Sequence, residues 1–371
     1  MVRTDANRFN RWVNLPLLVT AALLVVFGSV VVQSATSAMA GGDVLFRRHL
    51  FGIGLGLVMM ALAWAFDYTS LKAYLGPLII LDAFLVISPR IPGLGDTARG
   101  ATSWLEIAGF RLFQPSEPAK LVTIAIMAIV ISQYKGRIEE KKDVARVMGY
   151  LMIPLALILL QPDLGTGMVF VAIAMGMLLI GGLKPRWFIA FALAGVVIVA
   201  GVLYFNVLEQ YQEDRLVVFV EPSRDPWGAG YNLAQSKIAI GSGEITGKGL
   251  GSGTQSNLNF LPERHTDFIF SVLGEELGFV GAVMLLGLYL VLLVVALEIA
   301  ASSRDLSGSL IVAGLISMWT FQILVNMGMT IGLMPITGIP LPFMSFGSSS
   351  MVTNLVGTGM LLSVWARRYG V

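Results

Sequence analysis

The segment Leu261–Phe270 (LPERHTDFIF) concentrates polar and ionisable side chains directly before a long apolar run. Such groups are rare where a chain enters lipid unless they have a function. A carboxylate at a water–lipid boundary is suited to act as a general base, because partial burial makes it more basic, and Asp267 is our candidate for that role. Two structural alternatives stay open: Asp267 or Thr266 could cap the following helix, and His265 could pack or orient the loop.

A second polar cluster, Gln114–Lys120 (QPSEPAK), opens another apolar run. Glu117 and Lys120 are three residues apart and therefore share one helix face, where they form a structural pair or support a site. Near lipid, even a structural pair usually faces the bundle interior. Arginine binds phosphate through two parallel hydrogen bonds, so Arg99 and Arg111 upstream make this cluster a candidate for holding a phosphate-bearing headgroup.

Two further polar segments interrupt the apolar runs. The Pro-Asp-x-Gly pattern around Asp163 in Gln161–Thr166 (QPDLGT) is ordinary turn chemistry. In Gly338–Ser350 (GIPLPFMSFGSSS), alternating prolines exclude a helix, while the Gly and Ser residues from Ser345 onward expose backbone N–H donors. Non-helical backbone at membrane depth occurs only where protein buries it or where it lines a wet cavity. The segment predicts either a cavity wall for a polar headgroup or a plain re-entrant loop.

Composition decides the broad class of this protein. Hydrophobic residues make up 56% of the 371 residues and charged residues 13%, against roughly 25% charged residues in soluble domains. The sequence predicts an all-α polytopic membrane protein that forms a single integral membrane domain over residues 1–371. The lack of cysteine excludes disulfides and thiol chemistry, and no basic patch interleaved with aromatic residues indicates nucleic-acid binding.

A spanning helix needs about 20 mostly apolar residues, and the hydropathy pattern predicts about ten of them. The expected spans are 15–35, 50–66, 73–88, 116–133, 147–160, 165–183, 187–206, 268–299, 308–329 and 351–366. Lys and Arg in short loops favour the cytoplasmic side. With the N-terminus inside, 14 of the 25 basic residues are cytoplasmic, and an even number of spans puts both termini there.

This orientation places all four polar segments on the outer face. It also predicts a long extracytoplasmic loop, Val207–Thr266, between spans 7 and 8, and loops of that length are uncommon unless they function. Within this loop, residues 231–240 have amphipathic helical spacing, so we expect a helix at the interface there. The sequence therefore predicts chemistry at the outer membrane face.

The order of these motifs resembles the signature of the SEDS family (shape, elongation, division and sporulation proteins), which polymerise peptidoglycan. The matching segments span nearly the whole chain: Trp104-Leu105, QPSE, QPDLGT, QSKIAIGSG (Gln235–Gly243), GTQS (Gly253–Ser256), LPERHTDF and PLPFMSFG. Arg264 is more similar to the RodA branch than to the FtsW branch. The chain departs from the family pattern at Ser103, where a basic residue is common, and at Gly347-Ser348, where Gly-Gly is common.

The resemblance implies a peptidoglycan glycosyltransferase acting on lipid II, a disaccharide-pentapeptide on undecaprenyl pyrophosphate, for cell elongation and shape. The donor sugar is α-linked and the product bond is β-1,4, so a single displacement inverts C1 and needs one base, which we assign to Asp267 by analogy with inverting glycosidases. The leaving pyrophosphate needs charge neutralisation by Lys, Arg or a divalent metal ion, Mg²⁺ or Mn²⁺, whose ligands are unassigned. The expected substrate-binding or supporting residues are Glu117, Lys120, Arg264, His265, Gln114, Arg111, Asp163 and Ser345.

The resemblance also implies a location and partners. We expect the cytoplasmic (inner) membrane of a bacterium, a class B penicillin-binding protein transpeptidase as partner, and contacts with other membrane proteins of the elongation complex. Gly278 and Gly281 predict a close-packing surface for that partner. The alternative function is a lipid II flippase or other transporter, but transporters carry midplane ionisable groups in repeated halves, and no repeat is visible. A scaffold that only recruits partners leaves the buried ionisable groups unexplained.

Overall fold

The computed structural model describes residues 12–91, 95–98, 101–107, 110–205, 213, 215, 218–219, 221, 225, 228–258 and 260–369. For residues 95–98, 101–103, 106–107, 110–112 and 203 it describes the backbone alone. The chain divides into two compact units. Unit 1 comprises Met1–Tyr68, Val218–Arg304 and Trp319–Val371, and unit 2 comprises Thr69–Val217 and Asp305–Met318.

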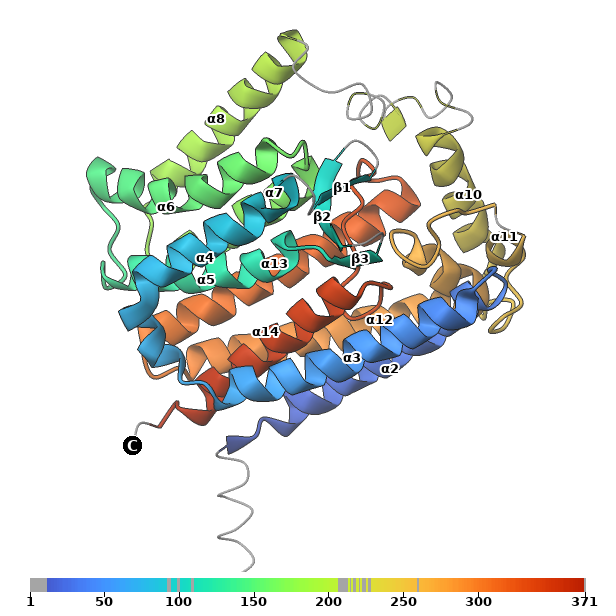
Figure 1. Ribbon diagram of the computed structural model, residues 1–371, viewed down its shortest axis with the longest axis horizontal. Helices are drawn as coiled ribbons and strands as arrows, with labels where there is room; N and C mark the ends of the chain where they lie inside the picture. The colour runs from blue at the N-terminus through green and yellow to red at the C-terminus, as the bar shows by residue number, and fades with distance from the viewer. Residues whose placement is uncertain are drawn as a thin grey trace, which may run out of the picture. The chain divides into compact units, whose positions relative to one another are not determined.

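Each predicted span corresponds to a helix, which confirms the all-α polytopic fold class. The helices are α2 (Leu15–Ser37), α3 (Gly42–Ala65), α4 (Leu75–Ile87), α5 (Ser116–Ser132), α6 (Lys141–Leu159), α7 (Leu164–Ile180), α8 (Pro185–Tyr204), α12 (Ile269–Ala301), α13 (Leu306–Ile331) and α14 (Ser348–Ala366) (Figure 1). In the described part of the chain, six segments are long and apolar enough to cross a membrane: α2, α3, Tyr68–Arg90, Pro185–Val202 of α8, α12 and α13. Helix α3 begins at Gly42, earlier than the predicted start at residue 50. The predicted start is late because the first turns of the helix carry Asp43, Arg47 and Arg48, which do not fit an apolar pattern.

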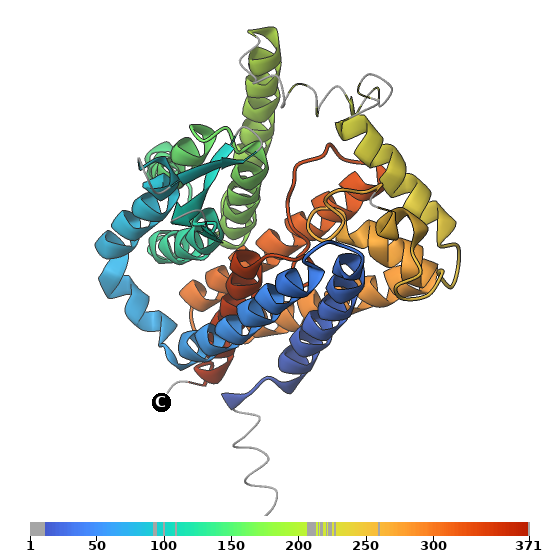
Figure 2. The same ribbon diagram turned by 45° about the vertical axis from the view of Figure 1, so that its right-hand side comes forward.

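Unit 1 is built on the antiparallel hairpin of α2 and α3, with α12 packed against α2 and α14 against α3 (Figure 2). Glycines allow α3 and α14 to approach closely: a Cβ on Gly52 would lie 2.9 Å from Ser348 Cα, and a Cβ on Gly359 would lie 2.3 Å from the Met60 carbonyl oxygen. In lipid, such close packing replaces the hydrophobic driving force between helices. Helix α10 (Ala229–Ser242) packs against α12 and confirms the helix predicted over 231–240.

The two ends of unit 1 carry different segments of the chain. Helix α2 begins and α14 ends at one end, where Arg367 donates to the Ala65 carbonyl at the end of α3. The α2–α3 turn and the segments that precede α12 and α14 lie at the other end, where Ser348 Oγ donates to the Arg48 carbonyl. The polar segments 261–270 and 338–350 therefore share one end of unit 1.

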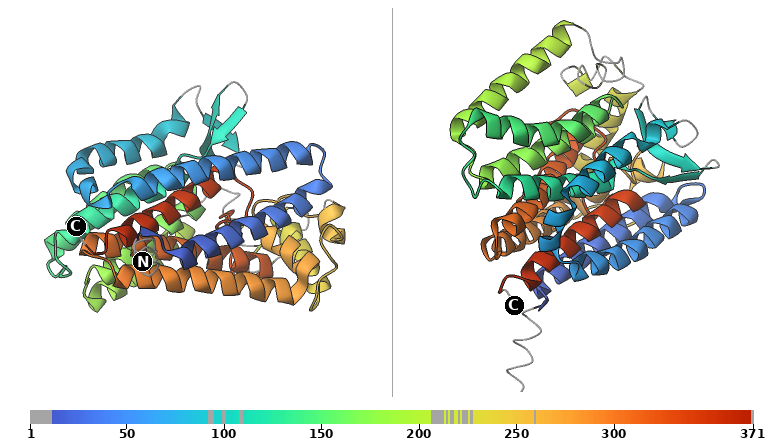
Figure 3. Two further views of the ribbon diagram at one scale, coloured as in Figure 1. Left: turned by 90° about the horizontal axis from the view of Figure 1, so that it is seen from below. Right: turned by 60° about the vertical axis from the view of Figure 1, so that its left-hand side comes forward.

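Unit 2 is organised around α5. Fourteen of the 17 residues of α5 are buried, so this helix has no solvent or lipid face and forms the core of the unit. Helices α4, α6 and α7 pack around it, as the right-hand view of Figure 3 shows. The first half of α13 is equally close, since a Cβ on Gly314 would lie 2.9 Å from Ile124. In contrast, none of the apolar window of α8 is buried within the structure.

Residues 89–115, which connect the predicted spans 73–88 and 116–133, contain an antiparallel three-stranded sheet. The strands β1 (Gly95–Ala98), β2 (Ala101–Ile107) and β3 (Phe110–Phe113) follow each other in the sheet in chain order. Gly95 pairs with Leu105, and Leu105 also pairs with Phe113, so β2 is the central strand. Strands this short carry too few alternations for a period-two pattern to be recognised, which explains why the sequence did not predict them.

Candidate active site

Asp267 lies in the irregular segment Leu261–Phe268, which we term the Asp267 loop. The backbone N–H groups of Thr266 and Phe268 donate to the Glu263 carbonyl at 3.3 and 3.1 Å, and Thr266 Oγ1 donates to Glu263 Oε2 at 3.0 Å. The N-cap residue of α12 is Phe268, and it makes no side-chain capping hydrogen bond. The residue at the N-cap position is therefore neither Asp267 nor Thr266, and Asp267 lies directly before it.

A second irregular segment, Gly338–Gly347, packs beside the Asp267 loop, and we term it the proline loop. The N–H of Phe346 donates to the His265 carbonyl at 2.8 Å, and Ser345 Oγ donates to the Thr266 carbonyl at 2.7 Å. The proline loop contains no helix, as its alternating prolines predict. The Phe346 N–H and the Ser345 hydroxyl thus hold the neighbouring loop, while the N–H groups of Met344 and Ser345 donate to the Leu341 carbonyl within the proline loop. Ser345 therefore belongs to the same constellation as Asp267.

The carboxylate of Asp267 lies over the start of the proline loop. A Cβ built on Gly338 would lie 3.4 Å from Asp267 Oδ2, and Gly338 has φ +72°, a conformation that side chains disfavour. Asp267 is half-buried. A carboxylate held against backbone at the end of a helical bundle, partly shielded from water, has the environment expected of a general base.

The two histidines of the chain flank one aromatic ring. The His265 ring centroid lies 5.2 Å from that of Phe346, and the His49 centroid lies 6.1 Å from it in a stacked arrangement. His49 is completely buried in α3, with Nε2 at 3.4 Å from Ser29 Oγ. This geometry supports the packing alternative for His265, because its ring orders the junction of the Asp267 loop with the proline loop.

Arg264 is buried, with 1% of its surface exposed. Its Nε donates to the Ala35 carbonyl at 2.7 Å, and its Nη1 donates to the Ser256 carbonyl. Burial lowers the pKa of the guanidinium. The side chain therefore ties the end of α2 and the short helix α11 (Thr254–Asn257) to the Asp267 loop. This geometry favours a positioning role for Arg264 over the predicted neutralisation of a leaving group.

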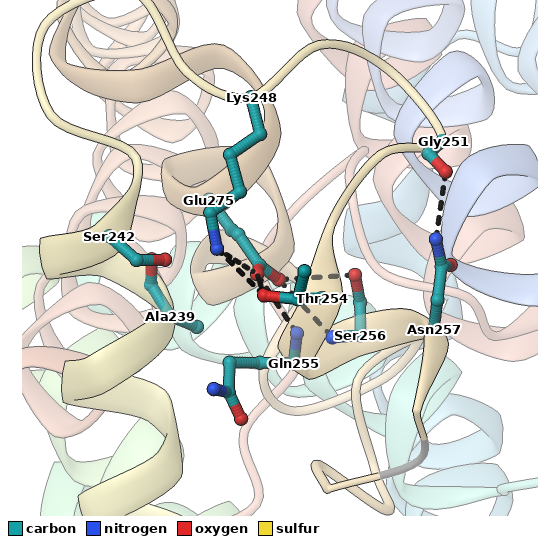
Figure 4. A network of polar contacts seen from close by, with 9 residues as sticks. All are labelled: Ala239, Ser242, Lys248, Gly251, Thr254, Gln255, Ser256, Asn257 and Glu275. Atoms are coloured by element: carbon teal, nitrogen blue, oxygen red, sulfur yellow. Dashed lines mark hydrogen bonds and ion pairs between the residues drawn. The ribbon is translucent and has the colours of Figure 1, made fainter.

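A buried carboxylate outside the polar motifs of the sequence anchors this region (Figure 4). Glu275 in α12 is completely buried and forms an ion pair with Lys248 at 2.8 Å. It also accepts hydrogen bonds from Thr254 Oγ1 at 3.1 Å, from the Gln255 N–H at 2.9 Å, and from the N–H and hydroxyl of Ser256, both at 3.2 Å. Glu275 thus fixes α11, whose Ser256 carbonyl in turn holds Arg264.

Helix α12 is interrupted at Gly278, which has φ +60° and ψ −157°. The loop of residues 243–249 fills the break. The N–H groups of Lys248 and Gly249 donate to the carbonyls of Glu275 and Glu276, respectively. In the opposite direction, the Phe279 N–H donates to the Glu244 carbonyl. A Cβ on Gly278 would lie 2.4 Å from the Gly247 nitrogen. Gly278 is buried by the protein's own loop, so the prediction of a partner-docking surface at this residue is wrong. The freed backbone groups find partners within the protein, as the membrane requires.

In unit 2, Glu117 and Lys120 form the predicted pair. Lys120 Nζ lies 2.8 Å from Glu117 Oε1, and their side chains are 2% and 6% exposed. The Glu117 N–H donates to the Gln114 carbonyl at 3.1 Å, which places Gln114 at the start of the same turn. The side chain of Arg111 lies outside the described residues, as does the whole of Arg99.

Asp163 has a defined structural role. Its Oδ1 accepts the Thr166 N–H at 3.0 Å and its Oδ2 accepts the Thr166 hydroxyl at 2.8 Å, so Asp163 is the N-cap of α7. The amide of the preceding Gln161 donates to the Val86 carbonyl in α4. The QPDLGT motif thus joins the α6–α7 turn to α4, and both polar motifs of unit 2 lie at the same end of that unit. This geometry favours the turn interpretation of Asp163.

Comparison with known proteins now decides the family. A model of the FtsW, RodA and SpoVE family, described as "Cell cycle protein", matches residues 10–369. The chain belongs to this family. Among relatives of the FtsW/RodA/SpoVE family, the probable peptidoglycan glycosyltransferase FtsW of Geobacter sp. (strain M18) is 36% identical over 95% of this chain and 97% of its own length. The peptidoglycan glycosyltransferase MrdB of Escherichia coli (strain K12) is also 36% identical, over 95% and 93%.

Solved structures in the FtsW/RodA/SpoVE family have the same fold. A chain of a complex described as a peptidoglycan synthase complex that coordinates polymerization and crosslinking superposes with a TM-score of 0.79 at 32% identity, covering 96% of this chain and 99% of that chain. Rod shape determining protein RodA of Thermus thermophilus superposes with a TM-score of 0.70 at 29% identity, covering 96% and 98%. The motif resemblance found in the sequence is confirmed at the level of the family.

The predicted divalent metal ion would need ligands from this chain or from its substrate. Among the residues that the structure describes, no three His, Cys, Asp or Glu side chains converge on one point. Mg²⁺ commonly keeps several waters and uses one or two carboxylates together with substrate phosphates. A metal prediction for this chain therefore depends on oxygens that the substrate would bring.

Proposed function

We propose that this chain is a peptidoglycan glycosyltransferase that polymerises lipid II into β-1,4 glycan strands at the outer face of the cytoplasmic membrane. One observation carries the proposal: Asp267, in the motif that first indicated this family, is half-buried beside the proline loop and lies directly before the N-cap residue of α12. The relatives named peptidoglycan glycosyltransferase cover nearly the whole chain and support the same activity.

In the proposed reaction, a sugar hydroxyl of the acceptor attacks C1 of the donor. The Asp267 carboxylate accepts the hydroxyl proton, the new β-1,4 bond forms on one face of C1, and the bond to pyrophosphate breaks on the other face with its electron pair leaving on oxygen. A positioned base typically contributes 10²–10⁴-fold to such a step. Inversion at C1 requires one displacement and one base, and one suitably placed carboxylate therefore suffices.

The leaving pyrophosphate requires positive charge, and two sources belong to the proposal. Lys120 carries a buried ammonium at the polar end of unit 2, already paired with Glu117. A divalent ion, Mg²⁺ or Mn²⁺, would stabilise the developing charge when bound with the pyrophosphate. Titration of Mg²⁺ and Mn²⁺ against turnover, with EDTA-treated protein as the reference, tests the metal: activity unaffected by EDTA contradicts it.

The proposal extends to location and partners. A class B penicillin-binding protein transpeptidase is the proposed partner, since the superposing chain comes from a synthase complex that couples polymerization to crosslinking. Elongation-complex membrane proteins are further proposed contacts. The start of α2 and the end of α14 lie at one end of unit 1, which supports termini on the same side of the membrane. We propose that this side is the cytoplasm and that the membrane is the inner membrane, from the distribution of Lys and Arg in the loops. The FtsW and MrdB relatives match this chain at the same 36% identity, so identity does not distinguish the FtsW branch from the RodA branch. Our proposal that the chain acts in cell elongation, as in the RodA branch, therefore rests on Arg264 in its motif alone.

The experiment that tests this function is direct. The purified full chain, with a cognate class B penicillin-binding protein, is incubated with lipid II, and the product is analysed for glycan polymer. We expect polymer that disappears in the Asp267→Asn variant. A flippase would instead move labelled lipid II across vesicles without forming polymer, and a scaffold would do neither. Either of those results contradicts the proposal.

A further inference from the structure

Helix α13 contributes a side chain to the candidate active site that no motif contains. Asn326 is completely buried near the end of this helix. Its Nδ2 donates to the Asp267 carbonyl at 3.0 Å and to the Ile339 carbonyl at 2.8 Å. One amide group of α13 therefore joins the Asp267 loop to the proline loop.

The chemistry of this contact is specific to an amide. Both partners are carbonyl oxygens, which only accept, so the NH₂ group with its two hydrogens must face them. A carboxylate at this position would direct oxygen against oxygen, and an aliphatic residue would leave two buried acceptors without a donor. Unpaired buried backbone groups are costly enough to move the backbone that carries them.

The position of the bond is informative too. It holds the backbone of Asp267 itself, and Ile339 directly follows Gly338, the residue beneath the Asp267 carboxylate. Ser345 makes a second tie between the same loops, since its hydroxyl accepts the Leu341 N–H at 2.8 Å and donates to the Thr266 carbonyl. The backbone of Asp267 and of its neighbour Thr266 is thus fixed by hydrogen bonds, and so is Ile339, next to the glycine beside the carboxylate.

We infer that Asn326 is a positioning residue for the Asp267 carboxylate: it holds the Asp267 loop and the proline loop together and so sets where the base lies relative to its substrate. This inference rests on the proposed function for its effect on turnover. Its structural half stands independently, because the two loops must loosen when the amide is removed, whatever reaction the protein performs.

The chain offers a matched control in the same unit. Asn354 in α14 is also buried, and its amide donates to the Ser350 carbonyl at 2.8 Å and accepts from Trp319 Nε1 at 2.8 Å. Asn326→Leu and Asn354→Leu therefore remove a buried amide of the same size from unit 1. Only the first of these amides bonds to the Asp267 loop.

The test uses full-length wild type and both variants, purified in detergent. Hydrogen exchange is read on peptides covering 262–268 and 340–346. Asn326→Leu should accelerate exchange in both peptides about ten- to a hundredfold, while Asn354→Leu leaves the 262–268 peptide unchanged. The 340–346 peptide is not used for this control, because Trp319, which Asn354 holds, packs against Phe343. Unchanged exchange in Asn326→Leu overturns the inference even if the protein proves to have another activity. Should Asn326→Leu fail to fold, Ser345→Ala, which cuts the second tie, must accelerate exchange in the same peptides, and its failure to do so overturns the inference.

Turnover with lipid II separates positioning from a general loss of stability. Asn326→Leu should lower kcat about a hundredfold per folded molecule with KM nearly unchanged, because a displaced base affects the transition state and leaves substrate binding intact. Asn354→Leu should keep the wild-type kcat. Wild-type kcat in folded Asn326→Leu, or an equal loss in both variants, overturns the positioning role. Absence of polymer with the wild-type chain counts against the proposed function alone, and exchange then decides the inference.

Discussion

The Asp267 loop in unit 1 and the first turn of α5 in unit 2 both bury a cation, but they stabilise it differently. Arg264 donates to two backbone carbonyls, whereas Lys120 is held by the carboxylate of Glu117. The carbonyls in the first turn of α5 are bonded within the helix, so a buried cation there needs an acidic side chain. Ala35 and Ser256 lie in the last turns of α2 and α11, where a helix leaves its carbonyls without intrahelical partners, and the five donors of a guanidinium match them.

This difference determines what each region tolerates. In the Asp267 loop, the polar side chains and the backbone support each other, so the position of the carboxylate depends on Arg264, Ser345 and Asn326 together. In α5, the pair is self-contained, and its two members could be removed together while the helix persists. Four predictions, taken from the largest expected effect to the smallest, test this contrast.

Asp267→Asn should reduce polymerisation by about 10²–10⁴-fold, the usual contribution of a general base. The side chains are nearly isosteric, so the variant should melt within a few degrees of wild type. Glu263→Gln is the control in the same loop: its amide oxygen can still accept from Thr266, and most turnover should remain. Measurement is by glycan gel at equal folded protein, and a fully active Asn variant removes Asp267 as the base.

Glu117→Gln or Lys120→Met should each destabilise the protein by about 3–5 kcal/mol, because the remaining charge is left buried without its partner. The double variant should recover most of that loss. Thermal unfolding in detergent measures it, with Lys142→Met as control, since the ion pair of Lys142 with Glu140 is exposed and contributes little. Equal losses in single and double variants would refute a self-contained pair, and wild-type turnover in the double variant would exclude it from the site.

Arg264→Lys should cost about 2–3 kcal/mol. The guanidinium donates to the Ala35 and Ser256 carbonyls from two different nitrogens, and the single nitrogen of an ammonium cannot take both positions; hydrogen bonds to charged groups contribute about 1.5–3 kcal/mol each. Arg367→Lys is the comparison, since Arg367 also donates to two helix-end carbonyls, Trp64 and Ala65, from a partly exposed position. The shift in melting temperature should be clearly smaller for Arg367→Lys. Similar shifts would show that burial of Arg264 has no special role.

Asp163→Ala should cost about 1 kcal/mol, the usual contribution of an N-cap. Because both oxygens of Asp163 bond to Thr166, we expect turnover per folded molecule to change little. Melting temperature and polymerisation rate are measured on the same preparation. A loss of turnover beyond tenfold at an intact melting temperature would return Asp163 to the substrate-binding residues.

Hydropathy determined the ten predicted membrane spans of this protein, because a spanning helix needs about 20 consecutive, mostly apolar side chains. The polar motifs were visible for the same reason: ionisable residues are rare beside apolar runs. The Glu117–Lys120 pair followed from helical spacing, which places residues three apart on one face. Family membership followed from the order of the motifs along the chain. Each of these features is local in sequence or nearly so.

Long-range packing decided the rest. Arg264 bonds to Ala35, 229 positions away, and Asn326 bonds to Asp267 across 59, so no local pattern distinguishes these side chains from others of their type. The sequence predicts a close-packing helix surface at Gly278, where the structure has a break in α12. A glycine within an apolar run indicates neither a positive φ nor the loop that packs into the break. Residue type and spacing show that a group can do chemistry. Which carbonyl, ring or carboxylate lies beside it depends on backbone segments that meet only when the helices pack.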